Sequence, residues 1–90
     1  MEEMMSMFLL AYSVRDGESE YTLHKVVFAH NERQATAAAL EYARDFFLTE
    51  TVGDEENANL YHTVDGTRAI ELEEVVKGTT GDLIERLLID

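Results

Sequence analysis

Hydrophobic and polar side chains alternate near the start of the chain. One face of the segment 8–14 is apolar throughout, with Phe8, Leu10, Tyr12 and Val14. The other face also begins apolar, with Met7, Leu9 and Ala11. A period of two predicts a β-strand. Because both faces are apolar, we expect this strand to lie well inside a sheet.

The first strand is followed by a hairpin signal. Asp16-Gly17 separates two alternating runs, and both central positions of the favoured tight turns accept positive φ. With a two-residue turn Tyr21 would lie opposite Tyr12, whereas with a four-residue loop it would lie opposite Val14. Both registers keep the same faces together, so the pattern alone leaves the choice open.

The clearest helix in the sequence comes after a second strand over residues 20–29. Asn31 is a favoured N-cap residue, and Gln34 stands three positions later, which is the spacing of a capping box. At 100° per residue, one broad arc of the segment 32–50 gathers Ala35, Ala39, Tyr42, Ala43, Phe46 and Phe47. This arrangement predicts an amphipathic helix packed against the sheet.

The second half of the chain repeats the outline of a hairpin followed by a helix. Residues 51–57 contain Gly53 and an acidic run, which favour an exposed loop. Alternating segments over 59–64 and 68–76 flank a second Asp-Gly pair and predict two further strands. A short apolar helix is expected after residue 81, with Leu83, Ile84, Leu87 and Leu88.

The predicted order is therefore β-β-α-β-β-α. We expect one α+β domain over residues 1–90, with residues 1–6 frayed and the core between about 7 and 89. Its architecture would be a four-stranded, mainly antiparallel sheet with one long helix on one face and a short C-terminal helix. Hydrophobic residues make up 46% of the chain, the usual level for a folded domain.

The net charge of the chain argues against some classes of function. The chain has 19 acidic and 7 basic residues, for a net charge of -12. A field of this sign disfavours nucleic acid and anionic membranes, and it attracts basic partners. No cysteine is present, so disulfides and thiol chemistry are excluded. The acidic N-terminus is unlike a signal peptide, and no apolar run approaches a membrane span, so we expect a cytoplasmic protein.

Candidate catalytic groups are few. His24, His30 and His62 have no metal-ligand spacing, and we interpret them as surface or edge residues. The tyrosines could serve in acid–base chemistry, but nothing in the sequence places them beside a histidine. We therefore expect a non-enzymatic protein without metal or cofactor.

Local concentrations of acid give the candidate partner-binding residues. They fall in one loop and along the last predicted strand, and comprise Asp54, Glu55, Glu56, Glu71, Glu73 and Glu74. One hypothesis is a small regulatory protein that engages a basic protein partner through this surface, as nucleic-acid mimics do.

The alternative is a cytoplasmic α+β domain whose acidity serves only solubility or salt adaptation, and which acts as a homodimer. Such a dimer would form through Leu83, Ile84, Leu87 and Leu88 or through the second face of the sheet.

Overall fold

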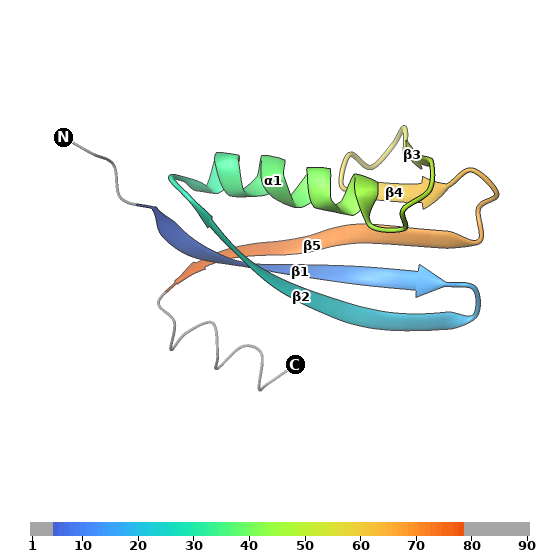
Figure 1. Cartoon of the computed structure of the whole chain (residues 1–90), viewed down its shortest axis with the longest axis horizontal. Coiled ribbons are helices and arrows are strands. Elements are labelled where there is room, and N and C mark those ends of the chain that lie inside the picture. Colours follow the sequence, from blue (N-terminus) through green and yellow to red (C-terminus); the bar gives the residue numbers. More distant parts are fainter. Residues whose placement is uncertain (1–4, 79–90) are drawn as a thin grey trace.

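The structure, a computed structural model, describes residues 5–78 (Figure 1). Its elements in chain order are β1 (Ser6–Asp16), β2 (Ser19–Ala29), α1 (Glu32–Asp45), β3 (Thr51–Gly53), β4 (Leu60–Thr63) and β5 (Arg68–Gly78). The described strands form one sheet in the order β2-β1-β5-β4-β3, with every neighbouring pair antiparallel. Figure 1 shows α1 running along one face of this sheet.

The α+β class and the antiparallel sheet are confirmed, but the prediction of four strands is wrong. The additional strand is β3, which lies within the segment 51–57 that the sequence predicts as loop. It is three residues long and pairs with β4, where Thr51 lies opposite Thr63. The predicted C-terminal helix lies outside the described residues.

Register in the first hairpin settles the alternative that the sequence leaves open. Tyr21 lies opposite Val14, and pairing continues to Asp16 and Ser19. The turn therefore consists of Gly17 and Glu18, one position later than the Asp-Gly pair. Gly17 has a φ of 64°, which glycine adopts without steric cost.

The core forms between β1, β5 and α1. Its buried residues are Leu10, Tyr12, Val14, Ala39, Ala43, Ile70 and Leu72. Tyr42, Phe46 and Phe47 pack against this cluster from the helix, and Ala35 is buried beside Phe8. The predicted helix face is thus confirmed: small alanines bring α1 close to the sheet, and aromatic rings fill the space toward its C-terminal end.

Capping of α1 follows the predicted spacing. The side-chain oxygen of Asn31 accepts a hydrogen bond of 2.8 Å from the backbone N–H of Gln34. The Gln34 side chain accepts 2.7 Å from the N–H of His30, one residue before the cap. The helix ends at Asp45 rather than near residue 50, and Leu48 then takes a φ of 56°.

The face of the sheet turned away from α1, here called the opposite face, has an apolar and a polar half. At the apolar end Leu9 of β1 is buried between its strand neighbours Val26 and Val76. Toward the other end of β1, Ser13 pairs with Thr22 and Glu71. The second face of β1 is therefore apolar over only part of its length.

Candidate interaction surfaces

Two hydrogen bonds bring the acidic loop and the acidic strand together. The side-chain amide of Asn57 donates 2.9 Å to the carboxylate of Glu71. Two residues further along, the carbonyl oxygen of Asn59 accepts 2.9 Å from the backbone N–H of Leu72. These hydrogen bonds hold the loop between β3 and β4 against β5. The predicted acids of the loop and those of β5 therefore lie in one region of the surface.

Short-range hydrogen bonds fix the shape of this loop. Asp54 donates its N–H to the carbonyl of Leu60 at 3.0 Å, and its carboxylate accepts 3.0 Å from the N–H of Glu56. The side-chain oxygen of Asn57 accepts 3.0 Å from the N–H of Asn59. Asp54 is half-buried by these contacts, whereas the side chain of Glu56 is exposed, as is that of the neighbouring Glu55.

A β-bulge decides where the acids of β5 point. Tyr12 pairs with Leu72 and Ala11 pairs with Glu74, so Glu73 is an extra residue without its own partner in the register. The bulge places Glu71 and Glu74 on the opposite face of the sheet, together with the odd-numbered residues of β1.

A shallow hollow lies beside the bulge. It has a volume of about 170 Å³, and its lining includes Glu73, Glu74, Asn59 and the first-turn helix residue Glu32. Glu32 is an acidic neighbour that the sequence did not assign to this surface. In the sequence, Glu32 stands out only by its position directly after the N-cap. An acidic residue is favourable there in any case, because it interacts with the helix dipole.

We call this region the acidic surface. It consists of the six predicted residues Asp54, Glu55, Glu56, Glu71, Glu73 and Glu74. Within residues 5–78, Arg44 forms ion pairs with Glu41 and Asp45. The basic side chain of Arg15 lines a hollow together with Glu71.

The histidines lie apart. His24 lies on β2 and pairs with Ala11 of β1. His62 lies on β4 and pairs with Val52 of β3 and Ala69 of β5. Two strands separate β2 from β4, which corresponds to roughly 14 Å across the sheet. Within residues 5–78 no group of three or more histidine and carboxylate side chains could hold a metal ion.

Tyrosines of the helix face are held by packing. Tyr12 is buried and donates a hydrogen bond of 2.8 Å to the carbonyl oxygen of Ala39. Its ring lies 5.7 Å from that of Tyr42, and the ammonium of Lys25 lies 4.6 Å above the Tyr42 ring. These contacts explain Tyr12 as part of the core and Tyr42 as part of its border.

A second surface is the groove between β2 and the C-terminal half of α1, here called the β2–α1 groove. It has a volume of about 560 Å³, and its apolar lining includes Val27, Tyr42, Phe46 and Leu48. The sequence does not predict this groove, because the groove depends on which strand lies at the edge beside the helix.

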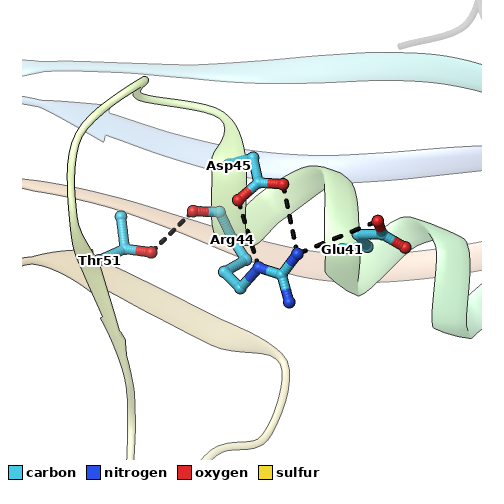
Figure 2. Close-up of polar contacts among 4 residues, drawn as sticks. All are labelled: Glu41, Arg44, Asp45 and Thr51. Atoms are coloured by element: carbon cyan, nitrogen blue, oxygen red, sulfur yellow. Dashed lines mark hydrogen bonds and ion pairs between the residues drawn. The ribbon is translucent and has the colours of Figure 1, made fainter.

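Arg44 offsets the acids at the end of this groove (Figure 2). Its guanidinium lies 3.2 Å from the carboxylate of Asp45 and 4.0 Å from that of Glu41. The carbonyl oxygen of Arg44 accepts a hydrogen bond of 2.7 Å from the hydroxyl of Thr51, which joins the helix end to the start of β3.

Comparisons with known proteins give no relative: no family model, no curated protein and no solved structure matches the chain. In the part of the chain that the structure describes, no helix has the length and apolar character needed to cross a membrane.

Proposed function

We propose that this protein is a small, non-enzymatic binding protein that engages a basic protein partner through its acidic surface. The hydrogen bond from Asn57 to Glu71 carries the proposal, because it joins the acids of the loop and those of β5 into one surface. A partner with Lys and Arg side chains would meet carboxylates from two segments that are far apart in the sequence.

Charge and exposure support this assignment. Glu55, Glu56 and Glu73 are exposed. The net charge of -12 attracts cationic partners toward the protein, and salt reduces the range of this attraction. A partner that ordinarily binds nucleic acid has a surface suited to rows of negative charge, so competition with nucleic acid is the expected regulatory effect.

Titration with an oligolysine peptide at increasing salt tests the proposal. We expect affinity to fall steeply as salt rises, because the contacts are charge pairs at the surface. We also expect the protein to displace duplex DNA from the same peptide. Affinity that stays constant from low to high salt would contradict the proposal.

A matched pair of triple variants separates this surface from the overall charge. The first neutralises it at Glu55→Gln, Glu56→Gln and Glu73→Gln. The control neutralises three exposed acids elsewhere, at Asp16→Asn, Glu18→Gln and Glu50→Gln, so that both proteins lose the same net charge. We expect the first variant to weaken oligolysine binding roughly tenfold and the control clearly less.

Equal losses in the two variants would support the second candidate, in which acidity only solvates the domain. One observation favours that candidate: exposed acids also occur at the first hairpin, with Glu18 and Glu20, and on α1, with Glu41. In that case molar salt should raise the free energy of unfolding markedly, because it screens repulsion that is spread over the whole surface.

A further inference from the structure

The two edges of the described sheet differ greatly in length. One side is stepped, because β3 has three residues and β4 pairs with β5 only at residues 69–71, whereas β2 ends the other side with a continuous strand of eleven residues. In an antiparallel pair alternate residues direct their N–H and C=O groups away from the partner strand. β2 therefore presents a long row of backbone donors and acceptors at its outer edge, and such a row is a template for another strand.

Large apolar side chains surround this edge. On the opposite face of β2, Val26 is 40% exposed and Phe28 is 60% exposed. On the helix side, Leu48 borders the β2–α1 groove and is 95% exposed. Its φ of 56° is a conformation that costs a leucine free energy and suits glycine, and the exposed side chain gains no burial that would offset this cost.

Charge near the edge is close to balanced, although the chain as a whole is strongly negative. The acidic residue of β2 is Glu20, at one end, and Lys25 stands in the middle. In the groove, the carboxylates of Glu41 and Asp45 share Arg44 as an ion-pair partner. A second copy, which carries the same charge of -12, therefore meets little repulsion at this edge.

We propose that a second copy of this chain docks on this edge, with β2 pairing antiparallel to β2 of the copy. The axis of two-fold symmetry would stand normal to the sheet, so that both helices lie on the same side of a continuous sheet. The β2–α1 grooves of the two copies then face each other across the junction and enclose both Leu48 side chains.

Side-chain chemistry selects the register in which Val26 lies opposite Val26 of the copy. That register pairs residues 23–29 and leaves Glu20 beyond the paired stretch. In the register with Lys25 opposite Lys25 of the copy, two like charges would face each other. In the register with Val27 opposite Val27 of the copy, the paired stretch would be shorter. The proposal is independent of the acidic surface, which lies at the β4–β5 side of the sheet.

Single cysteine substitutions test the geometry directly, because the chain contains no cysteine. Under mild oxidation Val26→Cys should form a disulfide-linked dimer, since directly opposite positions have Cβ atoms within reach of a disulfide. The controls are Val76→Cys, two strands further into the same face, and Val52→Cys on β3. A linked dimer with either control, or none with Val26→Cys, would overturn the proposal.

Solution mass gives a second test with a matched control. Wild-type protein should sediment as a dimer whose dissociation constant rises at least tenfold in Val26→Lys, because a charge at the junction must lose its water. Val52→Lys makes the same change on the other edge strand and should leave the constant unchanged. A monomeric wild type at high micromolar concentration contradicts the pairing, as does a dimer that Val26→Lys leaves intact.

Leu48→Gly has a signature that a purely structural role would not produce. At protein concentrations where the chain is monomeric, the free energy of unfolding should rise, since glycine relieves the positive φ. The dimer dissociation constant should increase roughly tenfold, because the leucine no longer loses exposed area on association. Unchanged dimerisation in this variant would show that the groove takes no part. Oligolysine binding should be unaffected, which keeps this test separate from that of the acidic surface.

Discussion

The hydroxyl group of Tyr12 donates a hydrogen bond of 2.8 Å to the carbonyl oxygen of Ala39. Tyr12 lies on the central part of β1, and Ala39 lies in the middle of α1, so this bond joins the two layers at the centre of the core. Both residues are fully buried. Without the bond, a phenol hydroxyl in this position would have lost its water and gained no partner.

Tyr12→Phe should therefore destabilise the protein modestly. The ring and its packing remain, and the loss is one buried hydrogen bond, for which we expect about 1 kcal/mol less free energy of unfolding. Urea denaturation followed by far-ultraviolet circular dichroism measures this difference. Tyr21→Phe is the control, because Tyr21 is exposed and should change stability little. A Tyr12→Phe variant as stable as the wild type would show that the bond contributes nothing.

Alkaline pH should act on the same group. Burial, with a smaller contribution from Tyr42, raises the pKa of Tyr12 above its usual value of 10.0. Above pH 10 the unfolded chain releases this proton while the folded protein retains it, so the free energy of unfolding must fall as pH rises. Below pH 10 the contribution is constant.

Comparison of wild type and Tyr12→Phe over this range isolates the effect. The wild type should lose stability more steeply above pH 10, so that the difference between the two proteins becomes smaller. Parallel curves for the two proteins would exclude Tyr12 as the group that titrates.

Periodicity in the sequence predicted those parts of the fold in which side-chain pattern and packing agree. The alanine and aromatic arc of α1 was correct because Ala35, Ala39 and Ala43 recur at the helical period and face the sheet. β3 was missed because Thr51–Gly53 is too short for any period to be recognised, and its pairing with β4 depends on tertiary contacts.

Placement of the acidic residues was predictable only in part. Their concentration in the loop and along β5 is visible in the sequence, but the bulge at Glu73 is not, because the break in alternation at Glu73-Glu74 is equally consistent with the end of a strand. Asn57 was likewise missed, since a loop asparagine has no feature that predicts a bond to Glu71, fourteen positions away.

Acid should weaken the second hairpin through Asp65. One oxygen of its carboxylate accepts hydrogen bonds from the N–H of Thr67 at 3.0 Å, from the hydroxyl of Thr63 at 2.7 Å and from the hydroxyl of Thr67 at 2.8 Å. These bonds lower the pKa of Asp65 from 3.8 to about 2. The folded state thus favours the ionised form, and its stabilisation is complete above pH 4.

As pH falls from about 4 to about 2, the wild type should lose this stabilisation. Asp65→Asn has no charge to lose, so its stability should vary less with pH over the same interval. Glu18→Gln removes one exposed carboxylate from the other hairpin and serves as the control. Thermal denaturation at a series of pH values measures all three proteins, and an Asp65→Asn variant with the wild-type pH dependence would contradict this role.

Asn57 provides a test of the acidic surface at constant charge. Asn57→Ala removes the bond to Glu71 and the acceptor for the N–H of Asn59, so the loop is no longer fastened to β5 through this side chain. We expect oligolysine affinity to fall roughly two- to tenfold, as suits the loss of one or two hydrogen bonds that position the carboxylates. The number of charges is the same, so the dependence of affinity on salt should keep its slope.

Asn31→Ala is the matched control: it removes the helix cap, lowers stability by about 1 kcal/mol and lies outside the acidic surface. If both alanine variants bind oligolysine as tightly as the wild type, the carboxylates act by number alone, and their arrangement by Asn57 has no part in binding.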